Sequence, residues 1–211
     1  MAKLTTQTFL ELKEIKEGVV TLKNGALRGL ISVSSLNFAL KSEDEQKATI
    51  YQFQSFLNSL DFSLEIVVES KRLNITGYLD KLKELGNKEE NELLSVQTKE
   101  YELFIREIIS GGAIMSKSFF AVVPFTFAEL PRISGDENKD SKGMSAAEER
   151  FQRARSQLWQ RMEFVSLGLR RCGLLCTPLN TTELIELFWS VYHPEESEVG
   201  YYPEIPPELI Q

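Results

Sequence analysis

The run SFFAVVPFTF at residues 118–127 is the strongest strand signal in this chain of 211 residues. Its side chains are apolar on both alternating faces, whereas a strand with one face in water alternates apolar and polar side chains. We therefore predict that residues 118–127 form the central strand of a sheet, with other elements covering both of its faces.

Two helices are predicted immediately before this strand, over residues 75–85 and 88–110. Gly111-Gly112 ends the longer helix, because glycine readily leaves the helical conformation. Four apolar side chains at helical spacing are expected to form the buried stripe of that helix: Leu93, Val96, Phe104 and Ile108.

A hairpin is predicted near the N-terminus, after a polar lead-in at residues 1–17. Asn24-Gly25 separates two apolar runs, at residues 18–22 and 27–36, and both turn residues tolerate positive φ. The pattern therefore predicts two antiparallel strands joined by a tight turn.

A capped helix and a further strand are predicted next. Ser42 and Glu45 form a capping box at the start of the helix. In the run from Phe62, Ile66 and Val68 alternate with polar residues, which predicts a strand with one face in water.

The segment at residues 130–144 differs from its neighbours in carrying charged and small residues without apolar periodicity, so we expect an exposed, mobile loop. A long amphipathic helix is predicted over residues 145–171. A short strand at 174–177 follows, and then a last helix over 181–192.

The predicted order of elements is β-β-α-β-α-α-β-α-β-α. This order favours an α+β fold in which helices pack on a single mixed β-sheet of about five strands. We expect one domain over residues 18–192, followed by an acidic, proline-rich tail at residues 193–211.

Composition excludes several classes of protein. The formal net charge of −7 argues against a general nucleic-acid binder, which needs a basic surface. Two cysteines, Cys172 and Cys176, and one histidine, His193, are too few for a typical structural zinc site, so we expect reduced, half-buried thiols and no bound metal.

We expect the chain to be cytoplasmic and to reach a membrane only through partners. No apolar run approaches the roughly 18 residues of a membrane-spanning helix. The N-terminus mixes lysine and glutamate and lacks the apolar run of a signal peptide.

The segment from Gly111 to Ser118 resembles a phosphate-binding loop, with Ser116 in place of the second glycine and Lys117 in the lysine position. A phosphate loop follows a strand and begins a helix, whereas here a helix is predicted before the glycines and a strand after them. We therefore expect neither a nucleotide nor another cofactor at this segment, and no catalytic residue elsewhere.

The long helix carries the candidate partner-binding residues. Arg150, Arg153, Arg161 and Arg171 fall on one flank of its apolar stripe, where they could meet an acidic partner or simply form a solvated surface. Trp159 lies off the stripe, which suits either a second packing surface or an exposed interface.

The tail offers a second set of candidates. Tyr201, Tyr202 and Ile205 lie in an acidic segment without lysine or arginine. Such anchors suit capture by a groove on another protein, although a plain spacer is an equal alternative.

Several runs spread over residues 18–192 resemble the N-terminal domain of TraC-like conjugal-transfer ATPases, the motor family of type IV secretion systems. They are LKNGALR at 22–28, VSSLNFALKS at 33–42, FQSFLNSLDF at 53–62, SKRLNI at 70–75 with Tyr78-Leu79, MSKSFFAVVPF at 115–125 and LIEL at 184–187. In that family a P-loop motor follows this domain, and we find no Walker motifs here. The resemblance therefore implies either a stand-alone counterpart of that docking domain or a chain cut before the motor. In both cases the implied role is to attach a motor ATPase to the cytoplasmic side of a secretion channel.

Three hypotheses follow. The first is a non-catalytic assembly component of a conjugation or type IV secretion apparatus, whose partners are a motor ATPase or other channel subunits and which takes no small-molecule substrate. The second is a small nucleotide-binding enzyme using residues 111–118. The third is a nucleic-acid adaptor using the arginine flank.

Overall fold

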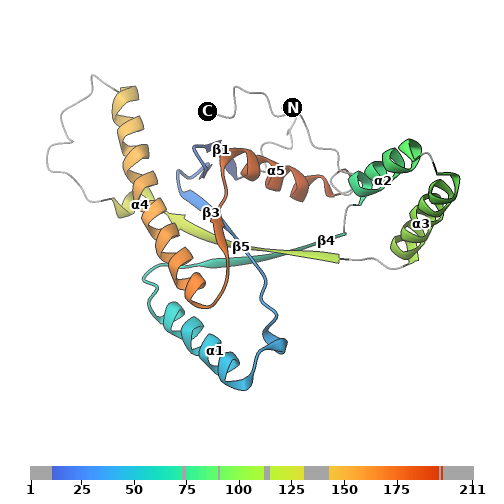
Figure 1. Ribbon diagram of the computed structural model, residues 1–211. Coiled ribbons are helices and arrows are strands. Elements are labelled where there is room, and N and C mark those ends of the chain that lie inside the picture. The colour runs from blue at the N-terminus through green and yellow to red at the C-terminus, as the bar shows by residue number, and fades with distance from the viewer. Residues whose placement is uncertain are drawn as a thin grey trace. The chain divides into compact units, whose positions relative to one another are not determined.

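The computed structural model describes residues 11–72, 75–89, 91–111, 115–130, 143–194 and 196 (Figure 1). The strands are β1 (Leu12–Lys16), β2 (Val19–Leu22), β3 (Leu27–Val33), β4 (Glu65–Arg72), β5 (Met115–Phe125) and β6 (Cys176–Pro178). The helices are α1 (Glu43–Asn58), α2 (Thr76–Lys88), α3 (Glu92–Gly111), α4 (Gly143–Arg171) and α5 (Thr181–Tyr192), with short 3-10 turns η2 (Phe38–Leu40) and η3 (Phe127–Glu129).

The strands form one antiparallel sheet in the order β1-β2-β3-β5-β4, and β6 also pairs with β3. The α+β class and the order of elements from β2 onward are confirmed. The expectation of a mixed sheet is wrong. Successive strands of this sheet run in opposite directions, so its pairings need no parallel crossover connection.

The additional strand, β1, lies in the lead-in that we expected to be polar and unpatterned. It pairs with β2 through a two-residue turn at Glu17 and Gly18, whose φ values are 53° and 73°. Positive φ at both residues is the geometry of a hairpin turn that matches strand twist. Glutamate is an unusual residue there, which explains why the sequence pattern missed this hairpin.

The predicted Asn24-Gly25 turn joins β2 to β3. Gly25 has a φ of 82°, and the Ala26 amide donates to Asn24 Oδ1 over 2.9 Å. The return strand ends at Val33, three residues before the predicted end.

β5 occupies the central position predicted for it, between β3 and β4. On one face Ala121, Val123 and Phe125 are buried. On the other face Val122 and Pro124 are only half-buried. The prediction of two fully covered faces is therefore correct for one face only.

α4 covers the buried face of the sheet. Leu158, Met162 and Val165 are fully buried in one core cluster with side chains of β3 and β5. Gly29 in β3 makes room for Met162, since a Cβ at Gly29 would lie 2.2 Å from the Met162 sulfur. α1 begins with the predicted capping box at Ser42 and contributes Phe56 to the same core.

Two predicted stripes are exposed instead of buried. In α3, Leu93, Val96, Phe104 and Ile108 are exposed. In β4, Ile66 and Val68 are exposed, because β4 is at the edge of the sheet and the core reaches only to Phe62 and Leu64.

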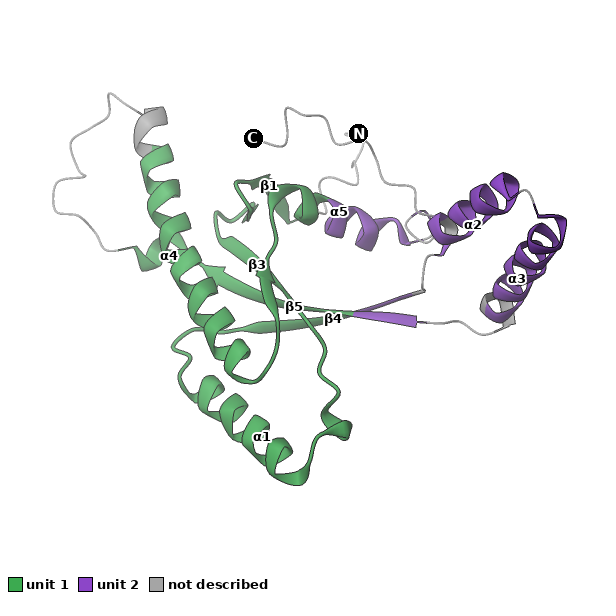
Figure 2. Ribbon diagram, in the orientation of Figure 1, with its two compact units in different colours: residues 1–68, 118–185, 205–211 green, residues 69–117, 186–204 purple. Residues whose placement is uncertain are grey.

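Over the range expected as one domain, the chain forms two compact units (Figure 2). Unit 1 comprises residues 1–68, 118–185 and 205–211, and unit 2 comprises residues 69–117 and 186–204. Within the described residues, unit 1 contains most of the sheet with α1 and α4, and unit 2 contains α2 and α3.

Candidate functional site

The arginines predicted to form one partner-binding flank have different environments. Arg161 is engaged inside unit 1: its Nη1 donates to the Pro124 carbonyl over 3.0 Å, and it forms an ion pair with Glu129. Its guanidinium also lies 4.8 Å from the ring centroid of Phe62 and 4.9 Å from that of Phe125. Arg161 therefore links α4 to β5 and η3. Its part in partner binding stays a prediction.

The ion pair affects the acid that receives it. Burial disfavours the charged form of Glu129, but hydrogen bonds from Arg161 and Thr126 outweigh burial and hold the pKa of this carboxyl below its ordinary value. The pair therefore stabilises the fold when Glu129 is ionised.

Arg150, Arg153 and Arg171 are exposed. Arg153 lies 3.9 Å from Glu149, one helical turn away, and both side chains are largely in water. A pair of this kind contributes little to stability. Three of the four predicted arginines are therefore exposed on α4.

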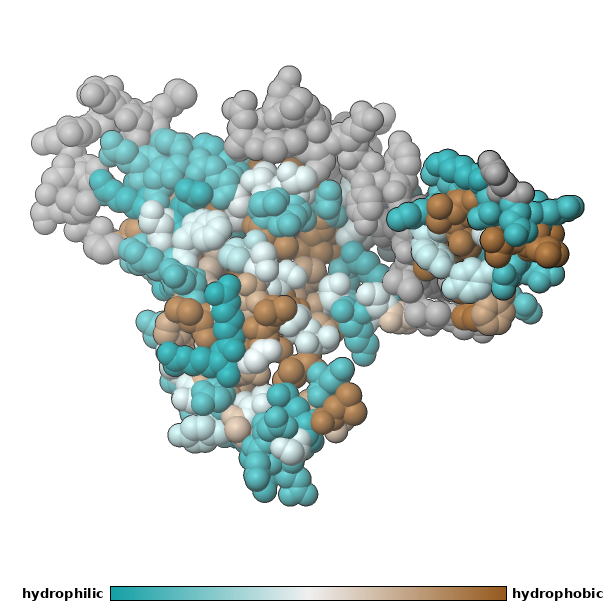
Figure 3. Space-filling view, viewed as in Figure 1, coloured by the Kyte–Doolittle hydropathy of each residue, from teal (hydrophilic) through white to brown (hydrophobic). Residues whose placement is uncertain are grey.

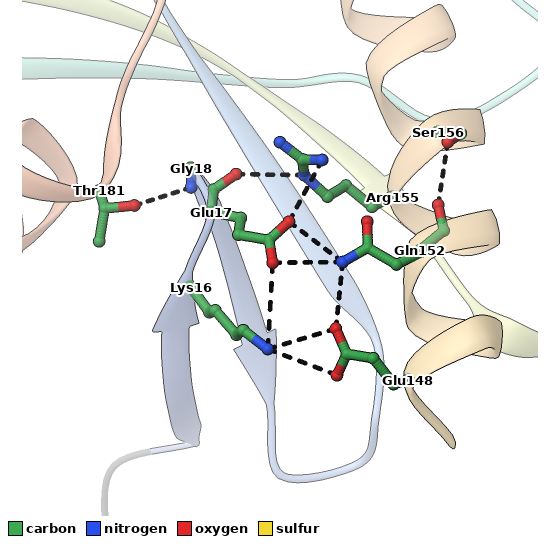
Figure 4. A network of polar contacts seen from close by, with 8 residues as sticks. All are labelled: Lys16, Glu17, Gly18, Glu148, Gln152, Arg155, Ser156 and Thr181. Carbon is green, nitrogen blue, oxygen red and sulfur yellow. Dashed lines mark hydrogen bonds and ion pairs between the residues drawn. The ribbon is translucent and has the colours of Figure 1, made fainter. Parts of the chain in front are cut away.

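A polar network at the N-terminal part of α4 joins this helix to the β1–β2 turn (Figure 4). The Arg155 guanidinium lies 3.2 Å from the Glu17 carboxylate and its Nε donates to the Glu17 carbonyl over 3.3 Å. Gln152 donates to Glu17 and Glu148, and Lys16 pairs with Glu148 over 3.3 Å. These contacts hold the turn residue with positive φ in place.

Trp159 is half-buried in unit 1 and packs against the same turn. A Cβ at Gly18 would lie 3.6 Å from the Trp159 ring, and the Arg155 guanidinium lies 5.9 Å from the ring centroid. Its indole nitrogen is buried and has no hydrogen-bond partner among the described residues. The second-packing-surface interpretation of Trp159 fits better than the exposed-interface one.

A hollow of about 310 Å³ lies beside Trp159, lined also by Gln160, Glu163, Ser166, Leu167, Arg170 and Pro178. The Ser166 hydroxyl is buried and, within the described part of the chain, without a partner. Arg170 donates to the Cys176 carbonyl over 3.1 Å, which ties the end of α4 to β6.

The tail candidates Tyr201, Tyr202 and Ile205 lie outside the described residues, as do residues 131–142 of the expected mobile loop. The last two residues of that expected loop, 143 and 144, already belong to α4.

The geometry around Gly111 is opposite to that of a phosphate loop. α3 ends at Gly111 and β5 begins at Met115, so a helix leads into this segment and a strand leads out. A phosphate is normally held by the free amides at the start of a helix. This segment precedes a strand instead.

The thiols of Cys172 and Cys176 are free and buried, more deeply than the half-burial expected. Burial raises the pKa of both thiols. Among the described residues, no three His, Cys, Asp or Glu side chains are grouped so that they could hold a metal ion. No described helix is both long and apolar enough to cross a membrane.

The surface that sequence reasoning missed is on α3, in unit 2. α2 packs on the side of α3 that carries Ser95 and Thr98, because Gly86 allows close approach: a Cβ there would lie 3.1 Å from Thr98. The pair is fastened by polar contacts, including Lys83 with Glu102 at 3.8 Å. Polar contacts thus join the two helices, while several apolar side chains of α3 remain exposed.

Seven large hydrophobic side chains of α3 are exposed among the described residues, Leu93 by 81% and Leu103 by 66%, and we call them the α3 surface: Leu93, Leu94, Val96, Tyr101, Leu103, Phe104 and Ile108. Figure 3 shows apolar side chains gathered over α2 and α3. A groove of about 450 Å³ follows α3 there, lined by Leu82, Leu94, Gln97, Thr98, Glu100, Tyr101 and Phe104. The structure shows that these apolar side chains are exposed, whereas periodicity alone predicted a buried stripe on this helix.

Comparison with known proteins gives one match. The family described as the archaeal TraC-like domain matches residues 13–194. No curated protein and no solved structure matches the chain.

Proposed function

Because the chain belongs to the archaeal TraC-like domain family, which is related to conjugation and secretion, we propose that it is a docking component of a conjugation or type IV secretion apparatus. In this role it links a motor ATPase, or another channel subunit, to the cytoplasmic side of the channel. It reaches the membrane through those partners.

The observation that carries the proposal is the α3 surface. Contiguous exposed apolar side chains on a protein surface mark sites of protein–protein contact. Leu103 and Phe104 are neighbours on α3 and both are exposed, and the groove beside Phe104 is the kind of feature that receives a side chain of a partner.

We propose that the domain is non-catalytic and takes no nucleotide, no other small-molecule substrate and no nucleic acid. The absence of nucleotide binding is supported by the order of a helix followed by a strand around Gly111. The absence of nucleic-acid binding is supported by the ion pair of Arg161 with Glu129 and by the net charge of −7.

The test is co-purification with the motor ATPase of the same secretion system after co-expression. The variant Leu103→Asp/Phe104→Asp should lose the motor while keeping the circular dichroism spectrum and melting temperature of the wild type, since both side chains are already exposed. Lys99→Glu on the same helix is the control. It makes the same change in net charge at an exposed polar position and should retain binding.

A double variant that still binds the motor as the wild type does would contradict the role of the α3 surface. A further arm uses a chain ending at Tyr192, which removes Tyr201, Tyr202 and Ile205. If this truncation abolishes binding and the α3 variant does not, the tail is the docking element. ATP binding that is lost in Lys117→Ala would contradict the non-catalytic role.

A further inference from the structure

β4 is an edge strand with an apolar edge. It ends the strand order beside β5, and no other strand of the described chain lies on its outer side. Three successive residues are exposed: Ile66 by 59%, Val67 by 45% and Val68 by 53%. Successive side chains of a strand point to opposite faces, so both faces are apolar next to unpaired backbone groups. Such an edge is a template for pairing with another strand.

We propose that β4 pairs antiparallel with β4 of a second copy of this chain, about a two-fold axis at Val68. A two-fold axis perpendicular to a sheet keeps each side chain on its own face. Two residues can lie opposite each other across the axis only if their side chains are on the same face of the sheet. Since side chains alternate between the faces, one residue of β4 must lie opposite the same residue of the other copy. Val67, Val68 and Glu69 are the residues near the middle of β4 that could occupy this position.

Charge selects among these three registers. With Val67 on the axis, Glu65 lies opposite Glu69 of the other copy, and with Glu69 on the axis two glutamates face each other. Like charges directly opposite each other are destabilising. With Val68 on the axis, Glu65 of each copy lies opposite Lys71 of the other copy. The two Val68 side chains lie opposite each other between these two pairs. This register alone places only opposite charges together.

Lys71 is able to take this second partner. Its ammonium group lies 3.1 Å from Glu69 Oε1 and donates to Ser190 Oγ over 2.7 Å. A lysine carries three donors, so one remains for Glu65 of the other copy. The Lys71 side chain is 34% exposed, so it is not closed off from solvent.

The experiment is sedimentation equilibrium of the full chain over a wide concentration range, combined with cysteine cross-linking. The wild type should show a monomer–dimer equilibrium. Val68→Cys should form a disulfide-linked dimer on mild oxidation, because directly opposite residues have Cα atoms about 4.5–5.5 Å apart, within the range of a disulfide. The wild type, whose own cysteines are buried, gives the background.

Val67→Cys is the matched control. In the proposed register the two thiols introduced by this substitution are offset by two positions along the strands. The Cα atoms that carry them lie roughly 8 Å apart, beyond disulfide reach. Val67→Glu, which places a carboxylate directly opposite Glu69 of the other copy on both sides of the axis, should raise the dimer dissociation constant by about tenfold or more. It should leave the circular dichroism spectrum unchanged, because Val67 is exposed.

Three outcomes would overturn the proposal. The wild type could remain monomeric at all concentrations, which would leave the edge for a strand of a different protein. Val67→Cys could cross-link as well as Val68→Cys, which would show another register or random collision. Val67→Glu could dimerise like the wild type, which would place the interface elsewhere. None of these results bears on motor binding through α3.

Discussion

Arg161 of α4 contacts Pro124, Glu129 and two aromatic rings within unit 1, and we expect its loss to destabilise this unit. Arg161→Ala removes a hydrogen bond to Pro124, an ion pair with Glu129 and contacts with two aromatic rings. The free energy of unfolding should fall by about 2–3 kcal/mol. Urea denaturation measures it, with Arg150→Ala as a control that should change stability by less than about 0.5 kcal/mol. Equal effects of the two substitutions would show that Arg161 is only a surface residue.

The lowered pKa of Glu129 predicts how acid affects its contact with Arg161. Its pKa is lowered in the folded chain, so its contribution to stability is present above the unfolded pKa and is lost as pH falls through the folded pKa. The difference in free energy of unfolding between the wild type and Glu129→Gln should be steady near neutral pH and shrink below about pH 4.3.

The control is the same substitution in the Arg161→Ala background. Without the guanidinium, the pH dependence of the Glu129→Gln effect should largely disappear. A pH dependence that survives in that background would assign the pKa shift to Thr126 alone.

At the scale of single residues, sequence periodicity placed the arginines on α4 correctly but could not identify the residues that they contact. Arg161 and Arg153 look alike in the pattern. Only the fold brings Glu129, Phe62 and Phe125, which are distant in sequence, around Arg161. The environment of Trp159 was equally out of reach, since it depends on the unpredicted turn at Gly18.

Among the helices, two glycines should respond oppositely to the same substitution. In α4, a Cβ at Gly168 would lie 2.1 Å from the Phe56 ring of α1, so Gly168→Ala must push the two helices apart. In α2, a Cβ at Gly77 would meet nothing within 4 Å. Gly168→Ala should cost about 1–3 kcal/mol, and Gly77→Ala should stabilise α2 by about 0.5–1 kcal/mol through helix propensity.

Thermal unfolding followed by circular dichroism measures both effects. The double substitution Gly168→Ala/Phe56→Leu serves as the control, because a smaller side chain at position 56 should recover part of the loss. If Gly168→Ala were neutral, α1 would have to be free to move away from α4 without losing its packing.

At the scale of elements, local signals performed well wherever local chemistry fixes the backbone. The capping box at Ser42 and the turn at Asn24 and Gly25 are present as predicted. Periodicity failed in α3, where the apolar stripe is real but the packed face is the one with Ser95 and Thr98. An apolar stripe predicts that a helix face will be covered, but it does not identify what covers that face.

Across the whole molecule, we expect stability to differ between the two units. Of the described hydrophobic side chains in α2 and α3, only Leu79 is buried, whereas α4 contributes a continuous buried stripe. Amide hydrogen exchange should therefore be at least about tenfold faster in α2 and α3 than in α4 and β3. Addition of the motor ATPase should slow exchange in α3, with β3 as the internal reference that does not change.

Uniform protection across all the helices would contradict this prediction. Slower exchange in α4 upon motor addition, without a change in α3, would move the docking surface to the exposed arginines of α4.

The global arrangement was predictable only in part. The α+β class follows from the order of elements and from the apolar run at residues 118–127. The antiparallel pairing and the division into two units depend on contacts between distant segments, which no local pattern encodes. Residues 69–117 and 186–204, for example, belong to one unit although 68 residues separate them.

The position of the α2–α3 pair in the chain has an evolutionary consequence. β4 and β5 are neighbours in the sheet, and adjacent antiparallel strands need only a short turn to connect them. Here the connection contains two helices instead. A segment inserted in this way can be lengthened, shortened or exchanged between lineages without shifting the pairing of the strands that flank it. If α3 is the docking surface that we propose, changes in its apolar face would alter the choice of partner and leave the pairing of β4 with β5 intact.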